Sequence, residues 1–175
     1  MNERIALYSA SIYDVAREEN CISAVYESLK AVEGLIGEDY VKLLTSAQLK
    51  SEEREALIGE AFGEKVHPYV LNFMKILAKK RIFDIFIPCS KEFEKKYYKE
   101  NNIEKITVTT AFDLTDEKKQ DIIEKLEKST GKTIEAQFKV KGEIIGGIII
   151  ETETSAIDGS VMGKLKKIER HISKN

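Results

Sequence analysis

The stretch NNIEKITVTTAF, residues 101–112, marks the point where the chain changes from one kind of structure to another. Before Asn101, apolar residues recur at the three- and four-residue spacing of amphipathic helices. From Ile103 onward they alternate with polar residues, which is typical of a half-buried strand. The residues expected on one face of this strand are Ile106, Val108, Thr110 and Phe112. The sequence therefore predicts two domains of different class, residues 1–103 and residues 104–175, in an α+β fold.

The first domain is expected to be a bundle of six helices. Its apolar stripes are separated by short polar links, which favour packing of neighbouring helices against one another. Ser51 is expected to be an N-cap, and Gly63 is expected to end the same helix. Pro68 is placed in the first turn of the fifth helix, where its missing N–H costs nothing.

The second domain is expected to be a small α/β unit in the order strand, helix, strand, strand, helix. Residues 133–141 alternate as a second strand, with Ile134, Ala136, Phe138 and Val140 facing in. A third strand from Ile144 to Glu151 is apolar on both faces and therefore interior. Gly146-Gly147 is placed within that strand, where a crossing helix would come close. The final helix is expected to carry Val161, Leu165, Ile168 and Ile172.

Composition excludes several functional classes. The chain has 175 residues and a net charge of −2, so charge gives no case for nucleic acid. Its longest apolar run, IIGGIII, is far shorter than the roughly 20 residues of a membrane span. Cys21 and Cys89 stand alone, and His67 and His171 are far apart, so no metal site can be assembled. We expect no cofactor, no metal and no direct membrane insertion.

Two segments resemble catalytic motifs without completing them. In STGKT, residues 129–133, a phosphate-binding loop would need glycine where Leu126 stands. The segment also ends a helix and opens a strand, so Gly131 is expected to be a C-cap. Asp158-Gly159-Ser160 precedes a helix, and Ser160 is expected to be its N-cap. His171 lies about 16 Å along that helix, too far to activate the serine.

Four stretches, taken together in their order along the chain, are similar to those of a known family. They are ALYSASIYDVAREEN (6–20), VHPYVLNFMKILAKKR (66–81), ITVTTAFDLTDEKKQ (106–120) and IIGGIIIETETSAIDGSVMGKLKKI (144–168). They resemble the delta subunit of bacterial F-type ATP synthases, a family that includes the mitochondrial oligomycin sensitivity-conferring protein. The resemblance covers nearly the whole chain and implies a subunit without a catalytic site, peripheral on the cytoplasmic face of the bacterial membrane.

The resemblance also implies two partners. The helical domain would hold the N-terminal segment of an alpha subunit of the catalytic head, through the first and fifth helices. The residues expected there are Tyr8, Ile12, Tyr13, Tyr69, Val70, Phe73, Met74 and Leu77. The second domain would bind the b subunits of the peripheral stalk, with Lys164, Lys167 and Arg170 as expected contacts. Such a subunit links the head to the membrane-anchored stalk during proton- or sodium-driven ATP synthesis.

Two other functions remain open from the residues alone. One is an unrelated cytosolic helical adaptor that binds neither head nor stalk. The other is a small enzyme that binds an anion at the helix start beside Ser160.

Overall fold

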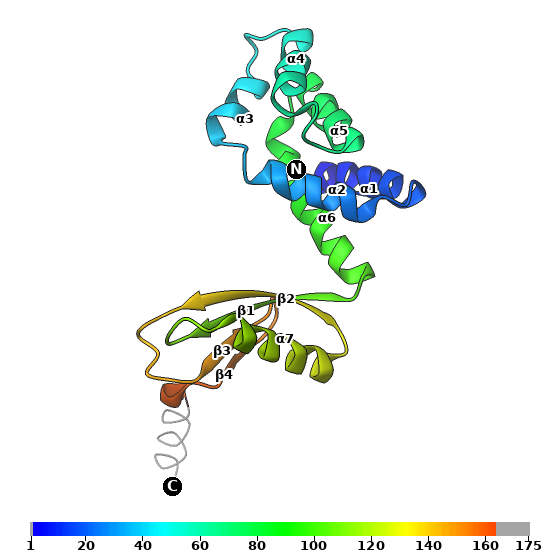
Figure 1. Cartoon of the computed structure of the whole chain (residues 1–175). Coiled ribbons are helices and arrows are strands. Elements are labelled where there is room, and N and C mark those ends of the chain that lie inside the picture. Colours follow the sequence, from blue (N-terminus) through cyan, green and yellow to red (C-terminus); the bar gives the residue numbers. More distant parts are fainter. Residues whose placement is uncertain (1, 164–175) are drawn as a thin grey trace. The chain divides into compact units, whose positions relative to one another are not determined.

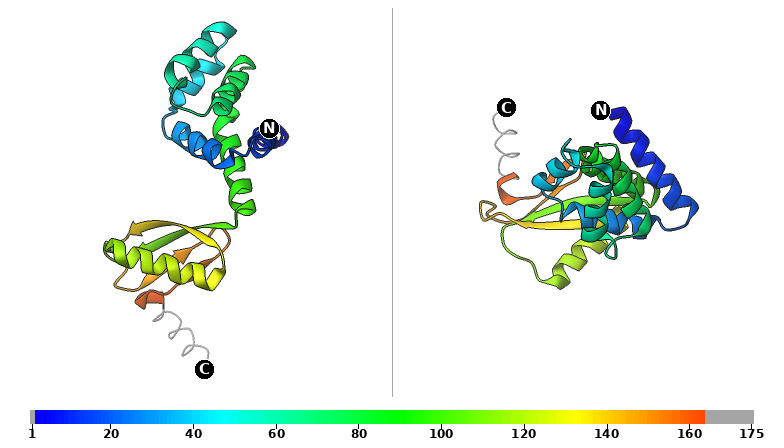
Figure 2. Two further views of the ribbon diagram at one scale, coloured as in Figure 1. Left: turned by 45° about the vertical axis from the view of Figure 1, so that its right-hand side comes forward. Right: turned by 90° about the horizontal axis from the view of Figure 1, so that it is seen from above.

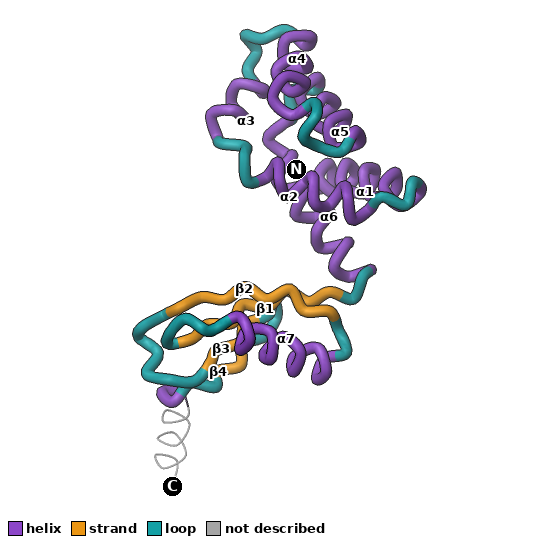
Figure 3. The backbone as a smooth tube through the Cα atoms, viewed as in Figure 1, coloured by secondary structure: helices purple, strands orange, loops and turns teal. Residues whose placement is uncertain are grey.

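The computed structural model describes residues 2–163 and divides the chain into two compact units (Figure 1). The helical unit is Met1–Tyr97 and the α/β unit is Tyr98–Asn175. Among the described residues, every strand belongs to the α/β unit, as the tube in Figure 3 makes plain. The predicted α+β class, a helical part followed by a small α/β part, is confirmed.

The helical unit contains the expected six α-helices. They are α1 (Asn2–Glu18), α2 (Ile22–Glu33), α3 (Glu38–Thr45), α4 (Ser51–Phe62), α5 (Pro68–Lys79) and α6 (Phe86–Glu100), with a 3-10 turn η1 (Phe83–Ile85) before α6. One continuous apolar core joins them, with aromatic side chains such as Phe83, Phe86 and Phe93 fully buried. Phe83 stacks on Phe86 with ring centroids 5.4 Å apart.

The ends of α4 and α5 test the capping predictions. Pro68 is the first residue of α5, and Gly63 follows the last residue of α4, as expected. The N-cap prediction for Ser51 is wrong, because Ser51 is already helical and Lys50 takes the extended cap conformation. The carboxylate of Glu53 accepts the backbone N–H of Lys50 at 2.7 Å, so the acidic residue supplies the cap that was assigned to the serine.

The boundary between the units falls inside α6 rather than after it. The sequence placed it between residues 103 and 104, where the apolar period changes. The last turn of α6 nevertheless packs with the α/β unit, since the Tyr98 hydroxyl donates to the carboxylate of Glu135. The Lys105 ammonium also lies 6.0 Å from the centre of the Tyr98 ring. A change of period marks the end of a helix, whereas a domain boundary depends on which core each side chain joins.

The α/β unit is a four-stranded sheet covered on one face by α7 (Asp116–Thr130) (Figure 2). The strands are β1 (Ile103–Thr110), β2 (Thr133–Val140), β3 (Ile148–Glu151) and β4 (Ala156–Asp158), in the order β2-β1-β3-β4. β1 and β2 are parallel, whereas β3 is antiparallel to β1 and to β4. Ile106, Val108 and Ile134 form a core against Ile122, Ile123 and Leu126 of α7.

The expected details of this unit are confirmed in part. Gly131 ends α7 with a left-handed φ of 68°, as predicted. Ser160 caps the next helix, since its hydroxyl accepts the N–H of Gly163 at 2.9 Å. Val140 is expected to face inward and Phe112 to share a face with the buried Ile106 and Val108, but they are 54% and 61% exposed. Val140 is the last residue of β2, and Phe112 lies beyond the end of β1 at Thr110.

The third strand is shorter than predicted, and a fourth strand was missed. β3 begins at Ile148, so Gly146-Gly147 precedes the strand instead of lying within it. The segment that comes close is the turn before the last helix and not a crossing helix, because Val161 N–H donates to Gly146 O at 2.9 Å. β4, three residues long, pairs with β3 and makes it interior. The final helix is described only over residues 161–163, so Leu165, Ile168 and Ile172 lie outside the described part.

Candidate functional site

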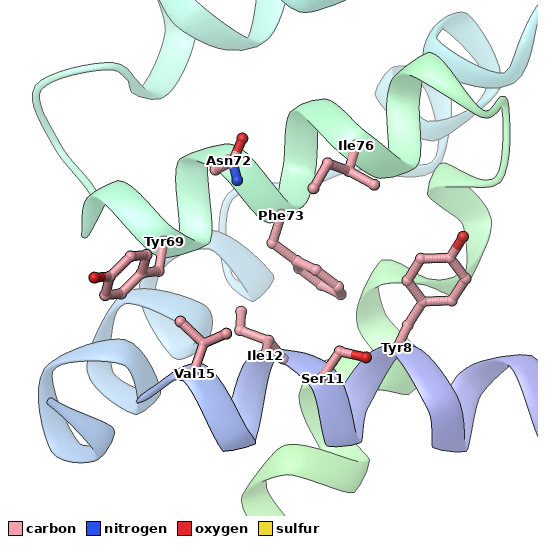
Figure 4. Close-up of a pocket in the computed structure, with 8 residues that line it drawn as sticks. All are labelled: Tyr8, Ser11, Ile12, Val15, Tyr69, Asn72, Phe73 and Ile76. Atoms are coloured by element: carbon pink, nitrogen blue, oxygen red, sulfur yellow. The ribbon is translucent and has the colours of Figure 1, made fainter. Parts of the chain in front are cut away.

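An apolar groove runs between α1 and α5 of the helical unit. Four residues of α1 and four of α5 line it, and its volume is about 200 Å³. The lining residues are Tyr8, Ser11, Ile12, Val15, Tyr69, Asn72, Phe73 and Ile76. Figure 4 shows that Val15 and Tyr69 lie at one end and Tyr8 at the other, so the two helices run in opposite directions along the groove.

The groove follows from the same spacing on both helices. Position i is Tyr8 on α1 and Tyr69 on α5, and the other lining residues follow at i+3, i+4 and i+7. Residues at this spacing form one stripe of a helix. The middle residue of each stripe is buried, Ile12 at 6% and Phe73 at 7% exposure, whereas Val15 and Ile76 keep 40% and 38% exposed. The floor of the groove is therefore part of the core and its rim is open apolar surface.

The structure brings together half of the residues expected to bind an alpha subunit. Tyr8, Ile12, Tyr69 and Phe73 line the groove.

The other four expected residues are Tyr13, Val70, Met74 and Leu77, and each has 0% of its surface exposed. Tyr13 packs against Phe93 of α6 with ring centroids 4.9 Å apart. These four residues belong to the core of the bundle and expose no surface to a partner in this structure, whereas for the four that line the groove the partner contact stays a prediction.

Four residues that line the groove were not among those expected from the sequence: Ser11, Val15, Asn72 and Ile76. Val15 and Ile76 carry a usable signal, because each extends an aromatic stripe by two turns at i+7. Ser11 and Asn72 are polar and lie between larger neighbours, so the sequence does not distinguish them from ordinary exposed residues of a helix. The Ser11 hydroxyl donates to Leu7 O at 2.9 Å, which leaves the wall of the groove without an unpaired hydroxyl there.

Each end of the groove has a charged neighbour. The ammonium of Lys80 lies 5.7 Å from the centroid of the Tyr8 ring. At the other end, desolvation and the nearby carboxylate of Glu19 raise the pKa of Tyr69 above its usual range. Tyr69 therefore keeps its proton at neutral pH and presents a neutral hydroxyl at the rim.

The described residues contain no arrangement suited to catalysis. No cluster of three His, Cys, Asp or Glu side chains in residues 2–163 could hold a metal ion. Burial raises the pKa of the Cys89 thiol to about 11, so at neutral pH it is a protonated core group and no nucleophile. The hydroxyl of Ser160 is engaged by Gly163 N–H, and the Asp158 carboxylate accepts Ser160 N–H at 2.9 Å. A carboxylate already occupies the place where an anion would bind.

The α/β unit exposes a second apolar surface at the end of its sheet. We call it the apolar end; its members are Phe112, Val140, Ile145, Val161 and Met162, each more than two-fifths exposed. Their segments meet at this end of the sheet, because Thr110 pairs in register with Val140 and with Ile148. Lys141 N–H also donates to Thr110 O at 2.8 Å, and Val161 N–H donates to Gly146 O at 2.9 Å. The expected stalk contacts Lys164, Lys167 and Arg170 lie outside the described residues.

Comparison with known proteins identifies the family. A model of the family described as ATP synthase delta (OSCP) subunit matches residues 5–172. This chain belongs to that family. It is 29% identical over 169 residues to the ATP synthase subunit delta of Clostridium botulinum (strain Langeland), which covers 95% of this chain and 94% of the relative. It is 30% identical over 160 residues to the subunit of that name from Fusobacterium nucleatum, covering 90% and 91%.

The fold agrees with the family. A chain in the mitochondrial ATP synthase hexamer of Toxoplasma gondii superimposes with a TM-score of 0.69 over 96% of each chain, at 15% identity. The chain is therefore a non-catalytic subunit of the peripheral stalk of an F-type ATP synthase. Over the described residues, no helix has the length and apolarity needed to cross a membrane.

Proposed function

We propose that this delta-family subunit joins the catalytic head to the stalk through one surface on each unit. The groove between α1 and α5 binds an amphipathic helix from the N-terminal segment of an alpha subunit. The apolar end of the α/β unit binds the b subunits. The complex stands at the cytoplasmic face of the membrane, which this subunit does not enter.

The observation that carries the proposal is the form of the groove. It is partly open to solvent, lined mainly by apolar surface and bounded by two helices, which is how a protein receives the apolar face of a third helix. Tyr8, Tyr69 and Phe73 also supply the aromatic surface on which binding energy tends to concentrate.

We expect Ile76→Asp to weaken binding of the alpha N-terminal segment by about 10- to 100-fold, because a buried apolar contact would be replaced by a desolvated carboxylate. Ile76 is 38% exposed in the free protein, so the variant should fold. Isothermal titration of the full chain with a peptide of the alpha segment measures the change, and circular dichroism checks the fold.

Leu35→Asp is the matched control for that variant. Leu35 is an equally apolar residue, 70% exposed, in the connection between α2 and α3 and outside the groove. The Leu35→Asp variant should bind the peptide with the affinity of the wild type. Equal affinity of Ile76→Asp and Leu35→Asp, with both folded, would show that the groove is not the binding site. Tyr13→Asp and Met74→Asp are unsuitable tests, because each places a charge in the core.

The two surfaces should separate with the two units. We expect a fragment of residues 1–104 to fold on its own and to bind the catalytic head, but not to bind the peripheral stalk. The core of the helical unit draws only on residues from Ile5 to Tyr97, so the fragment keeps it whole. Thermal melting followed by circular dichroism tests folding, and pull-down against the isolated head and against a stalk fragment tests binding. A fragment that captures the stalk as well as the full chain does would refute the division of labour.

A further inference from the structure

Helix α5 begins at a histidine cap. His67 precedes Pro68, the first helical residue, and the Nδ1 atom of its imidazole accepts the backbone N–H of Tyr69 at 3.4 Å. The backbone N–H of His67 donates to the hydroxyl of Ser28 on α2 at 2.9 Å, which holds the cap residue in place. Since Pro68 has no N–H, the imidazole receives the first amide of the helix that needs a partner.

This cap differs from the common ones in its response to pH. Serine, threonine, asparagine and aspartate are the usual N-cap residues, and none of them changes charge between about pH 5 and 8, whereas imidazole does. Nδ1 can accept a hydrogen bond only while it carries no proton, so the cap requires a neutral imidazole with its proton on Nε2.

Protonation of the imidazole acts on α5 in two ways. It turns Nδ1 from an acceptor into a donor, which removes the bond to Tyr69 N–H. It also places a positive charge beside the positive end of the helix dipole. Both changes destabilise the first turn of α5, so the stability that the cap contributes is present while the imidazole is neutral and is lost as the pH falls.

The surroundings of His67 offer no replacement for the lost bond. Within residues 2–163, the imidazole forms no ion pair with a carboxylate. Glu19 and Cys21 act on the hydroxyl of Tyr69, at the far end of that side chain from the capped amide. The other charged residues on the neighbouring segments are all exposed; they are Glu64 and Lys65 on the link between α4 and α5, and Glu27 on α2.

The cap supports one wall of the groove. Tyr69 is the second residue of α5 and lines the groove at the end where Val15 lies (Figure 4). The ring centroids of Tyr69 and His67 are 5.3 Å apart. Loss of the bond to Tyr69 N–H therefore loosens the turn that positions this ring.

We propose that His67 is a pH-dependent switch: its neutral imidazole caps α5, and its protonation at acidic pH frays the first turn of α5 and weakens binding in the groove. The first part of this proposal concerns the helical unit alone. The second part rests on the proposed function of the groove. Attachment to the head would then weaken when the pH around the subunit falls.

Two variants fix the cap in one state each. In His67→Asn the cap is kept and does not titrate, because asparagine is a preferred N-cap residue. In His67→Lys there is no acceptor, and the positive charge stays at every pH in the range. Amide hydrogen exchange of α5 in the full chain measures the stability of this helix, with the β1 amides as an internal reference.

We expect α5 of the wild type to exchange about 5-fold faster, relative to His67→Asn, at pH 5.5 than at pH 7.5, which is the effect of losing one N-cap. Comparison at equal pH cancels the intrinsic pH dependence of exchange and the titration of all other groups, His171 included. His67→Lys at pH 7.5 should behave as the wild type does at pH 5.5, and the β1 amides should not respond to either variant.

Binding supplies the second arm. Isothermal titration of the full chain with a peptide of the alpha N-terminal segment should show the affinity of the wild type, relative to that of His67→Asn, falling by about 3- to 5-fold from pH 7.5 to pH 5.5. Both proteins meet the same peptide at each pH, so protonation of the peptide cancels in the ratio.

The outcomes separate this proposal from the one it rests on. A ratio of exchange rates that stays constant with pH would overturn the switch. A ratio of exchange rates that changes with pH, together with a constant ratio of affinities, would show that the cap does not control the groove. If neither protein binds the peptide at either pH, the proposed function of the groove fails, while hydrogen exchange still decides whether the cap titrates.

Discussion

Gly147→Ala is expected to destabilise the α/β unit by more than about 3 kcal/mol. The added methyl group would clash with neighbouring backbone atoms, and the backbone conformation at this position is strained for any residue with a side chain. A Cβ on Gly147 would lie 2.5 Å from the carbonyl oxygen of Gly159 and 2.8 Å from Cα of Ser160. Both are backbone atoms held by neighbouring hydrogen bonds, Gly159 N–H to Ile148 O and Val161 N–H to Gly146 O. The φ of Gly147 is also +89°, which L side chains rarely adopt.

Substitutions at two other glycines separate the cost of the steric clash from the cost of backbone strain. Gly142→Ala, in the same connection, meets nothing within 4 Å and has no positive φ, so it should be neutral. Gly131→Ala also meets nothing, but its φ is +68°, so it should cost only the backbone strain of about 1 kcal/mol. Hydrogen exchange of the β1 and β3 amides measures the loss in the α/β unit, with the α5 amides as an internal reference. A cost for Gly147→Ala no larger than that for Gly131→Ala would contradict the close approach of residues 159–160.

Much of the fold could be predicted from the sequence, because the apolar period reports directly on local geometry. The change at Asn101-Asn102 located the first strand, and the alternation in residues 133–140 located its parallel neighbour. The short β4 escaped prediction because three residues are too few to establish a period, and they become a strand only by pairing with β3. Gly146-Gly147 was assigned to a close approach, but local sequence could not say which distant segment approached.

The groove was harder to predict than the fold. Periodicity identifies the apolar side of a helix, but α1 is apolar over a wide arc, and different parts of that arc meet different neighbours. Ile12 faces α5 across the groove, whereas the adjacent Tyr13 packs on Phe93 of α6. Which residue lies on which side depends on where α6 crosses α1, and that is set by contacts some 80 residues apart, such as the bond from Cys89 Sγ to Ile5 O.

A buried arginine in the helical unit went unnoticed for a similar reason. Arg54 sits in the charged run SEEREA of α4, where its pattern matches a solvated helix face. In the structure it is only 2% exposed. Its Nε donates to Ala78 O at 2.9 Å, and its Nη1 donates to Leu49 O at 2.7 Å and to Ser46 O at 3.2 Å. The Arg54 guanidinium thus connects the segment between α3 and α4 to the C-terminal end of α5 through hydrogen bonds.

Arg54→Met is expected to lower the stability of the helical unit by about 2–4 kcal/mol, because three carbonyl groups lose a charged donor while the aliphatic stem is largely preserved. Arg54→Lys should recover only part of the loss, since an ammonium has no fork with which to reach three carbonyls in different directions. Arg17→Met is the control: Arg17 is exposed and, within residues 2–163, forms an ion pair only with Asp14 at 3.4 Å, so its replacement should cost under about 1 kcal/mol.

Denaturant unfolding followed by circular dichroism, with hydrogen exchange of the α4 and α5 amides, measures the loss in this unit, and the β1 amides should be unaffected. Ala78 lies near the end of α5, which forms one wall of the groove. If the groove binds the alpha segment as proposed, Arg54→Met should also weaken that binding indirectly, and Arg54→Lys should weaken it less. Stability of Arg54→Met equal to that of Arg17→Met would mean that water replaces the guanidinium without cost and that the link does not depend on it.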